Sequence, residues 1–582
     1  MIIGIDLGTT NSLVSILEQD GPKLIPNALG EYLTPSVVAI DETGMALVGR
    51  AAKEHQVMHP DSSVSCFKRF MGTDWTAKLP SGEFTPIQLS SLILGSLKAD
   101  AEAYLGVAVS SAVITVPAYF HDGQRQATIE AGKMAGLKVE RIINEPTAAA
   151  MAYGIHEKEA DKTVAVFDLG GGTFDISIVD FFEGCIEVRA SAGEAILGGE
   201  DFTRAMARTI LAERSIMFET AELKSPAMVA RLIQQCEQAK RRLSQDQKTQ
   251  ILMPDPQGML DPDGEKVVVT REFIIDACEP LFQKIEKPIR RAMGDAKLTT
   301  SDLDEVILVG GATRMPSVVA LSKKVFNQDP QGHLNPDHVV ALGAAIQAGL
   351  ISQNSAVDDV VVVDVAPFTL GVSISKEMGN EYREGYFLPI INRNTTIPTS
   401  RSHRLVTLGP NQREILLQVY QGENRRVKDN LLLGTLRVTG IPSGPAGQEI
   451  DVRFTYDNNG VLEVEATIVQ TKSKVNMVLA KHASHLDAHE IERAVAAMQK
   501  LKIHPRETTA NRFLLKRAER VFQELPSMLR DQLGHLLDYF EHAMDSQEPA
   551  DIEIARKQLE LFLSANDLLS DDLEEGPEGD AS

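Results

Sequence analysis

The spacing of apolar residues divides the chain into regions of different texture. From residue 1 to about 356, short apolar runs alternate with helical stretches, which is typical of an α/β domain. Residues 112–116 predict a strand and residues 122–135 predict a helix. Residues 146–154 predict a second helix, whose small side chains allow a neighbouring backbone to approach closely. The first region therefore predicts an α/β domain at 1–356.

A short apolar run that ends in Val363 lies where the α/β pattern stops. It begins at Val360 and is bracketed by Asp358, Asp359 and Asp364. Because it stands between two regions of different texture, we interpret residues 357–364 as an interdomain linker with a function. A buried strand is the alternative, and periodicity alone does not decide between them.

The rest of the chain changes texture twice more. Residues 365–484 alternate apolar and polar positions, most clearly at 452–456 and 462–468 on either side of the turn 457–460, and predict an all-β domain. Residues 485–570 then show helical periodicity and are divided by prolines into several helices. These prolines are Pro505, Pro526 and Pro549. Residues 571–582 are acidic and poor in apolar side chains, which predicts a disordered tail.

Composition narrows the possible functions. A chain of 582 residues is too long for one core. With 58 basic and 81 acidic residues its net charge is −23, which disfavours nucleic acid and anionic membranes as partners. The four cysteines have no metal-site or disulfide-scaffold spacing and are expected to be reduced thiols. No signal peptide or membrane span is predicted, so the expected location is the cytoplasm.

Two turns of the same sequence, Asp-Leu-Gly, each follow an apolar strand. The first begins at Asp6 and the second at Asp168. Each supplies a carboxylate, glycines that let backbone N–H groups approach an anion, and threonine hydroxyls. A single copy has an ordinary strand-and-turn interpretation at about even odds, but the repeat favours two turns that face each other around a Mg-phosphate. The aspartates would then hold magnesium, directly or through its waters.

Other residues are candidates for the rest of a nucleotide site. Gly310 and Gly311 follow a third apolar strand, and the adjacent Arg314 is able to stack on a purine. Four polar residues at spacings of three and four predict one helix face that grips a base and ribose, or else a solvated charged face. They are Glu237, Lys240, Arg241 and Ser244.

Three residues point to hydrolysis. Lys68 lies between apolar residues and is able to place a point charge near the terminal phosphates. Glu145 and Asp175 are candidates for positioning the attacking water. Because phosphoryl transfer to water needs mainly alignment and charge neutralisation, this set is sufficient for a slow ATPase.

With these motifs the chain resembles the seventy-kilodalton heat-shock chaperones, the DnaK family, over nearly its whole length. The motifs are IGIDLGTTNS (3–12), ITVPAYF (114–120), IINEPTAAA (142–150), DLGGGTFD (168–175), LGGEDF (197–202) and NRNTTIP (392–398). The resemblance implies a multidomain protein with an actin-like two-lobed α/β ATPase domain, a hydrophobic linker, an all-β peptide-binding sandwich and an α-helical lid.

The resemblance also implies roles for individual residues. The hydrolytic site would contain Lys68, Glu145, Thr173 and Asp175, with Asp6 and Asp168 around Mg²⁺ through its waters, and K⁺ as a possible further ion. Phosphate and adenosine would meet Gly8, Thr9, Thr10, Asn11, Gly170, Gly171, Gly172, Gly198, Gly199, Glu237, Lys240, Arg241, Ser244, Gly310, Gly311, Arg314 and Asp337. The relay from nucleotide to linker, and the surface for a J-domain co-chaperone, would involve Pro117, Arg125, Arg141, Asn144 and Asp364.

The sequence also departs from the general family pattern. The stretch between Lys68 and Pro117 and the helical region are short, which resembles the specialised bacterial HscC branch. By ungapped alignment, the peptide pocket would be lined by Val372, Leu405, Ile415 and Leu417, with Ser375 and Leu408 over the peptide. The large and small arch residues are exchanged relative to the bacterial pattern, so a different peptide preference is expected. A shift of one residue would undo this inference, because strand side chains alternate faces.

The resulting hypothesis is an ATP-dependent chaperone of the stress response. ATP and ADP would control binding and release of extended apolar segments of unfolded or specific client polypeptides, with a J-domain partner and an exchange factor as a further candidate partner. Two alternatives are a small-molecule kinase of the actin-like superfamily and a non-catalytic nucleotide-sensing scaffold. The kinase leaves residues 365–570 unexplained, and the scaffold does not account for the hydrolytic set.

Overall fold

The computed structural model describes most of the chain. The described residues are 1–154, 161–182, 185–331, 334–354, 357, 361–379, 381–397, 399–456, 462–479, 510–546 and 549–566. Val360, the predicted turn 457–460, the start of the helical region with Pro505, and the acidic tail lie outside them.

The first lobe is built on a mixed sheet with strand order β11-β10-β1-β2-β3, in which β4 pairs with β2. Helices α2 and α3 share its apolar core. A small sheet, β6-β5-β7, and the hairpin β8-β9 complete the lobe with helix α1. The bounds are β1 (Ile2–Asp6), β2 (Asn11–Glu18), β3 (Gly21–Ile25), β4 (Thr34–Pro35), β5 (Val37–Ile40), β6 (Ala46–Val48), α1 (Arg50–Met58), β7 (Ser63–Ser65), β8 (Ala77–Leu79), β9 (Gly82–Phe84), α2 (Pro86–Leu105), β10 (Ser111–Val116), α3 (Asp122–Met134) and β11 (Lys138–Asn144).

The second lobe repeats the pairing of the first. Strand β12 pairs in parallel with β17 and antiparallel with β13, just as β1 pairs in parallel with β10 and antiparallel with β2. Its sheet has the order β17-β12-β13-β14-β18-β21. The bounds are β12 (Lys162–Leu169), β13 (Phe174–Phe182), β14 (Cys185–Glu194), α5 (Gly199–Ala212), α6 (Phe218–Lys224), α7 (Pro226–Arg242), β15 (Lys248–Leu252), β16 (Lys266–Thr270), α8 (Arg271–Ala296), β17 (Glu305–Val309), α9 (Pro316–Phe326), β18 (Val361–Val365) and β21 (Thr396–Ile397).

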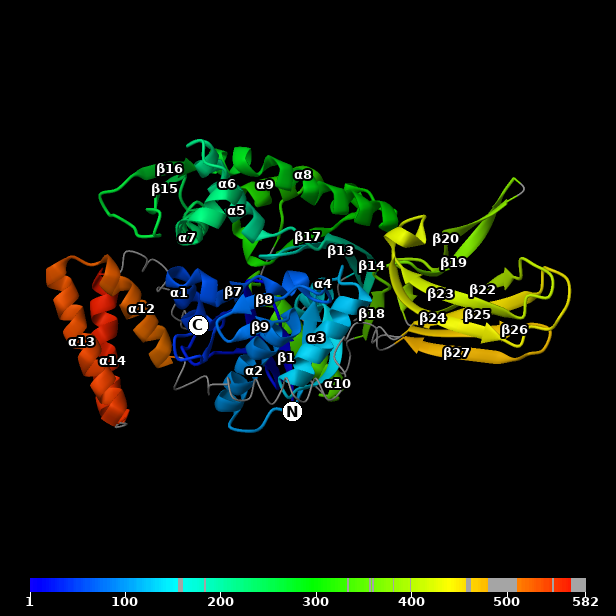
Figure 1. Cartoon of the computed structure of the whole chain (residues 1–582), viewed down its shortest axis with the longest axis horizontal. Helices are drawn as coiled ribbons and strands as arrows, with labels where there is room; N and C mark the ends of the chain where they lie inside the picture. Colours follow the sequence, from blue (N-terminus) through cyan, green and yellow to red (C-terminus); the bar gives the residue numbers. More distant parts are fainter. Residues whose placement is uncertain are drawn as a thin grey trace.

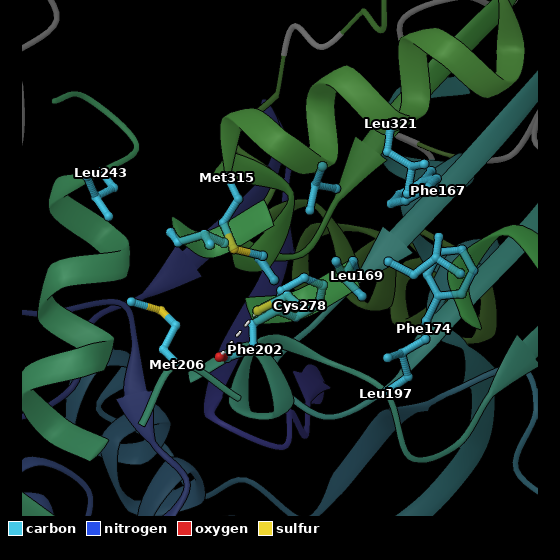
Figure 2. Close-up of a cluster of buried hydrophobic side chains, with 14 of the residues drawn as sticks. Phe167, Leu169, Phe174, Leu197, Phe202, Met206, Leu243, Cys278, Met315 and Leu321 are labelled. Carbon is cyan, nitrogen blue, oxygen red and sulfur yellow. Dashed lines mark hydrogen bonds between the residues drawn. The ribbon is translucent and has the colours of Figure 1, made fainter. Parts of the chain in front are cut away.

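The core of the second lobe lies between its sheet and its helices (Figure 2). The rings of Phe167 and Phe174 lie 4.8 Å apart between centroids, on the two strands that flank the second Asp-Leu-Gly turn. The buried Cys278 thiol donates to the carbonyl of Phe202, at 3.7 Å. None of the four cysteines is disulfide-bonded, as the sequence predicted. This packing fixes the strand end that carries the second turn.

Two helices of small residues join the lobes. They are α4 (Glu145–Gly154) and α10 (Val339–Ile351), which share one buried cluster with strands of both sheets. The backbones lie so close that a Cβ on Gly343 would stand 1.7 Å from the carbonyl oxygen of Ala148. The close approach predicted from residues 147–152 is therefore present, although the helix begins at Glu145 rather than Pro146.

Two four-stranded sheets follow the lobes, with orders β20-β19-β23-β24 and β22-β25-β26-β27. One apolar cluster contains residues of both sheets. The strands expected at 452–456 and 462–468 are present as β25 and β26 and pair antiparallel. The bounds are β19 (Leu370–Met378), β20 (Glu381–Ile391), β22 (Thr399–Val406), β23 (Glu414–Gln421), β24 (Leu431–Thr439), β25 (Glu449–Tyr456), β26 (Leu462–Ile468) and β27 (Lys474–Leu479).

Three helices, α12 (Ala510–Glu524), α13 (Ser527–Ser546) and α14 (Pro549–Asn566), form a separate bundle with its own core. Pro526 separates α12 from α13 and Pro549 begins α14, as predicted. The bundle and the β19–β27 region lie at opposite ends of the molecule, with the two lobes between them (Figure 1). The bundle attaches through α12, which packs on α1 of the first lobe.

Candidate nucleotide site and its connections

The two Asp-Leu-Gly turns face each other across the lobes, as the repeat predicted. A Cβ on Gly171 would stand 1.8 Å from the Oγ1 of Thr10, and one on Gly172 would stand 2.4 Å from the Cγ2 of Thr9. Only glycine fits at these two positions, because a larger side chain would displace the opposite turn. A hydrogen bond from Thr10 to Glu200, at 3.1 Å, also crosses from the first turn to the second lobe.

Four carboxyl groups gather beneath the turns. Asp168 and Asp175 are directly opposite each other in the β12–β13 register, whereas Leu13 stands opposite Asp6 in the first lobe. Neighbours at such positions have side chains on the same face. The second turn therefore presents two carboxylates where the first presents one.

Burial and the repulsion of neighbouring carboxylates raise the pKa values of the three aspartates, Asp6, Asp168 and Asp175. Burial and the nearby Glu145 raise the pKa of Asp6 to about 7 and that of Asp175 to about 8. Burial, Glu145 and Asp175 raise the pKa of Asp168 well above its ordinary value. Ionising all of them together requires positive charge nearby, and clustered carboxylate oxygens are the donors that Mg²⁺ prefers. The residues present therefore fit a magnesium ion.

Lys68 supplies the cation that the structure places in this cluster. It is buried, and its Nζ donates to the Oε1 of Glu145 at 2.6 Å. The same Nζ lies 5.6 Å from the centre of the Phe120 ring. Glu145 is the first residue of α4 and comes directly after β11, so strand end and helix start hold the carboxylate.

Arg69 is a residue of this region that sequence reasoning missed. Its guanidinium donates to the carbonyls of Gly172 and Gly171, at 3.1 and 3.4 Å, and pairs with Asp201. Asp201 in turn accepts from the backbone N–H of Gly198 at 2.8 Å. Arg69 therefore ties the first lobe to the second turn. The signal for it was its position beside Lys68 together with the acidic residue in the LGGEDF motif.

The turn at Gly198 and the Gly310 turn after strand β17 complete the walls of the candidate nucleotide site. A Cβ on Gly198 would stand 2.4 Å from the backbone of Gly171, and one on Gly311 would stand 2.5 Å from Asp337. Arg314 donates to Asp337 at 2.8 Å, and its side chain is about half exposed. The structure thus gathers the predicted phosphate and adenosine residues from both turns, the Gly198 segment and the Gly310 segment.

Helix α7 carries three of the four residues expected on its polar face. Lys240 Nζ pairs with Glu237 at 2.6 Å and donates to the carbonyl of Gly199 at 2.7 Å, while Arg241 pairs with Glu237 at 2.9 Å. Burial acts to raise the pKa of Glu237, but Lys240 and Arg241 outweigh it and hold that pKa well below its ordinary value. Ser244 was expected on the same helix, and that placement was wrong, because Ser244 lies beyond the helix end at Arg242; its contact with nucleotide stays a prediction.

A chain of hydrogen bonds leads from the first lobe to the segment expected to be a linker. Arg125 donates to Asn144 at 2.5 Å, and Asn144 donates to Asp364 at 2.8 Å. Thr147 also donates to Asp364, at 3.2 Å, and burial raises the pKa of Asp364. The backbone carbonyls of Phe120 and Ala118 hold Arg125 near Pro117. Arg141 lies on β11, and its Nε has no hydrogen-bond partner among the described residues.

The segment around Asp364 is a strand. Strand β18 pairs in parallel with β14 of the second lobe and antiparallel with β21. On the sequence alone, a linker and a strand were alternatives for this segment. In the structure Val361–Val365 joins two regions and is also hydrogen-bonded into a sheet, so the two are not exclusive. Val361 is exposed at the start of the strand, whereas Val365 at its end is buried in the cluster that α4 and α10 share.

A comparison with family models decides the identity of the chain. The Hsp70 protein family model matches residues 2–80 and 76–575. The chain belongs to the Hsp70 family. Members of this family are chaperones and ATPases that bind nucleotide with Mg²⁺ and act on client polypeptides with co-chaperones. In the part of this Hsp70 chain that the structure describes, no helix combines the length and apolar character needed to cross a membrane.

The residues expected to form the peptide groove of this Hsp70 lie on β19, β22 and β23. Val372 and Leu417 are buried in the shared core of the two sheets, and Leu405 and Ile415 pack against it. Leu408 follows the end of β22 and is exposed, and Ser375 is half-buried on β19. The four pocket candidates therefore belong to or pack against one apolar cluster.

Proposed function

We propose that this Hsp70 is an ATP-dependent chaperone in which ATP hydrolysis controls binding and release of extended apolar segments of client proteins. The observation that carries the proposal is the position of β18. It extends the second-lobe sheet beside β14, and Asp364 at its end accepts from Asn144 of the first lobe. Any change in the angle between the lobes must alter this strand, because it is bonded to both.

The proposed domains follow the sequence boundaries. They are an ATPase domain at 1–356, a linker at 357–364, a peptide-binding sandwich at 365–484, a lid at 485–570 and a tail at 571–582. The proposed branch is HscC, and the proposed location is the cytoplasm. A J-domain partner would act near Arg141, Asn144 and Asp364, and an exchange factor and K⁺ are further candidates.

For hydrolysis, we assign Lys68 to the terminal phosphates and Glu145, Thr173 and Asp175 to the attacking water. A magnesium ion held by Asp6 and Asp168, through its waters, would neutralise phosphate charge. The side chain of Lys68 is anchored by Glu145 at 2.6 Å, which keeps its ammonium in place before substrate arrives. Asp175 accepts from the backbone N–H of Tyr119 at 3.2 Å, and this bond fixes the orientation of its carboxylate.

A second connection supports coupling between this site and the β region. The Tyr119 ring, whose backbone N–H bonds Asp175, lies 4.5 Å from the ring of Phe368 between centroids. Phe368 precedes β19, which carries Val372. A shift of the Asp175 carboxylate during hydrolysis would therefore reach the strand of the proposed groove through Tyr119 and Phe368.

Hydrolysis is tested by single-turnover measurements with Lys68→Met. Loss of the buried ammonium is expected to slow hydrolysis at least 100-fold, a magnitude on the order of that for losing one preorganised charge. Lys78→Met is the matched control, because its ion pair with Glu83 lies at the surface with the lysine side chain 84% exposed. Equal rates in both variants would contradict the assignment.

Coupling is tested by release of a fluorescent apolar peptide with and without ATP. We expect ATP to accelerate release in the native chain, and we expect Lys68→Met to retain this acceleration if it still binds ATP, because release follows binding rather than hydrolysis. Release that is unchanged by ATP would contradict the coupling but not the ATPase activity.

A further inference from the structure

A cluster of two imidazoles and a carboxylate lies away from the nucleotide site, at the end of α1. It contains Glu42, His55 and His59, whose ligand atoms all lie within 4.8 Å of one another. His55 and His59 are one helical turn apart, and their rings stack with centroids 4.6 Å apart. Asp41 holds the turn that presents Glu42, because its Oδ1 accepts from the backbone N–H groups of Thr43 and Met45 at 3.0 Å.

One ring nitrogen of His55 is buried and has no hydrogen-bond partner among the described residues. Its Nε2 is hydrogen-bonded to Ser62 at 2.9 Å, which fixes the ring, but its buried Nδ1 has no partner among the described residues. His55 is only 2% exposed. A buried polar atom without a partner is uncommon in native proteins and calls for a ligand, a water or an ion. His59 and Glu42 are both exposed, with side chains 48% and 63% accessible, so solutes reach the cluster from that side.

We propose that this cluster binds a divalent transition metal of the zinc type, with His55 Nδ1, His59 and Glu42 as its protein ligands. Two imidazoles and one carboxylate suit zinc, and the same donors do not suit the hard Mg²⁺ expected at the nucleotide. Zinc–ligand distances of about 2.0–2.2 Å require the ligand atoms to lie within about 4 Å of one another. The exposed side chains of His59 and Glu42 supply the small adjustment. The other ring nitrogen of His55 donates its N–H to the Ser62 hydroxyl and so orients that ligand, as such partners commonly do.

The site is connected to the helical bundle through Glu42. Lys516 of α12 pairs with Glu42 at 3.2 Å and also with Glu519 at 3.1 Å. Because the Lys516 ammonium and a divalent cation would share one carboxylate, the metal competes with Lys516 for Glu42. Metal binding is therefore expected to weaken the contact of α12 with α1, and removal of the Lys516 charge is expected to tighten metal binding.

The test is calorimetric titration of ZnCl₂ into the full chain, freed of metal with a chelator and without nucleotide. We expect one site that His59→Gln and Glu42→Gln each weaken at least 10-fold. His59 is chosen because its exposed ring is removable without opening a core. His535→Gln is the matched control, since His535 is an exposed histidine of α13 outside the cluster. Lys516→Met should bind zinc more tightly than the native chain.

Zinc binding at native strength by both His59→Gln and Glu42→Gln would overturn the site, because it would place the metal elsewhere, for example on cysteine thiols. Absence of any zinc site in the native chain would also overturn it. Native-strength binding by Lys516→Met would contradict the competition with α12. Hydrogen exchange of residues 510–524 with and without zinc gives an independent readout, and faster exchange with zinc is the expected result.

Discussion

The lobes of this Hsp70 hold two other regions, and they hold them differently. The β19–β27 region attaches through a shared strand and a set of polar bonds, whereas the helical bundle attaches through one helix laid on α1. At the first attachment, Arg393 pairs with Asp295 at 2.8 Å, and Gln421 accepts from the backbone N–H of Asp122 at 3.1 Å. At the second, Phe513 packs beside Ala51 and Ala52, and Arg520 pairs with Glu54 at 3.0 Å.

The difference lies in what each attachment shares with the candidate nucleotide site. Two routes connect the site to the β region, one through Asp175, Tyr119 and Phe368, the other through Arg125, Asn144 and Asp364. The α12 contact lies on α1 and the small β5–β7 sheet, which carry none of the predicted nucleotide residues. We infer that a change at the candidate nucleotide site alters the contacts of the β region directly. The helical bundle, in contrast, moves together with the first lobe as a rigid body.

Arg520→Met breaks the bundle attachment and has the largest expected effect. Arg520 is buried, and its loss leaves Glu54, with a side chain 15% exposed, without that cation. Breaking a buried pair costs about 3–5 kcal/mol. Amide exchange in α12 should therefore rise by roughly 100-fold to several thousand-fold, measured by hydrogen exchange mass spectrometry, while β18 exchange stays unchanged.

Arg556→Met is the control, since Arg556 forms its ion pairs within α14 and is not part of the α1 contact. Equal exchange of α12 in the native chain and Arg520→Met would mean that α12 does not depend on this pair. Faster exchange of β18 in Arg520→Met would show that the two attachments are not independent.

Asp364→Ala removes one of the bonds that attach the β region to the first lobe. Asn144 and Thr147 lose the acceptor they share, and leaving buried donors unsatisfied costs about 1–3 kcal/mol. We expect the acceleration of peptide release by ATP to fall about 10-fold or more, with single-turnover hydrolysis changed much less. Asp329→Ala is the control, because Asp329 pairs with Lys323 at the surface. A parallel loss of hydrolysis would place Asp364 in the catalytic machinery instead.

Acid should loosen the attachment of the β region by protonating His121. His121 caps α3, and the next residue, Asp122, donates its backbone N–H to Gln421 of the β region. The Nδ1 of His121 accepts from the backbone N–H of Gln124 at 3.3 Å and so caps α3. Burial and Arg125 lower the pKa of His121 from 6.5 to about 4. Because the pKa of His121 is depressed in the folded protein, its neutral ring contributes stability that is fully present above pH 6.5. This stability is lost as the pH falls toward 4, and the loss is about 2 kcal/mol by pH 5.

The measurement is exchange of the α3 amides, corrected for intrinsic rates, at pH 7.5 and pH 5. His121→Asn keeps a capping oxygen but removes the titration, so its protection should change less with pH than that of the native chain. His535→Gln should behave like the native chain. The idea fails if His121→Asn and the native chain lose the same protection.

Arg393→Ala tests the surface part of the β-region attachment and has the smallest expected effect. Its side chain is 27% exposed and pairs with Asp295 and Glu423. Partly exposed pairs contribute about 1 kcal/mol, so ATP-dependent peptide release should slow only about 5-fold. Arg404→Ala, whose pair with Glu449 lies on the far more exposed face of the β region, is the matched control. A loss as large as that of Asp364→Ala would reverse this ranking.

Local pattern was sufficient for much of the fold and for the turns of the site. Strand alternation predicted β25 and β26, and prolines predicted the breaks before α13 and α14. The repeated Asp-Leu-Gly turns predicted two facing loops, because a glycine-rich turn after a buried strand has few other uses when it occurs twice. Periodicity extended the polar face of α7 one turn too far, since three- and four-residue spacing does not mark where a helix ends.

The sequence by itself determined which elements form and which chemistry the strand ends carry, because these depend on residues a few positions apart. The tertiary structure decided what those elements meet. Arg69 reaches Gly172 across the lobes, and β18 is both a connection and a strand. Each is a contact between residues far apart in the chain, fixed by packing of the two lobes rather than by any local preference.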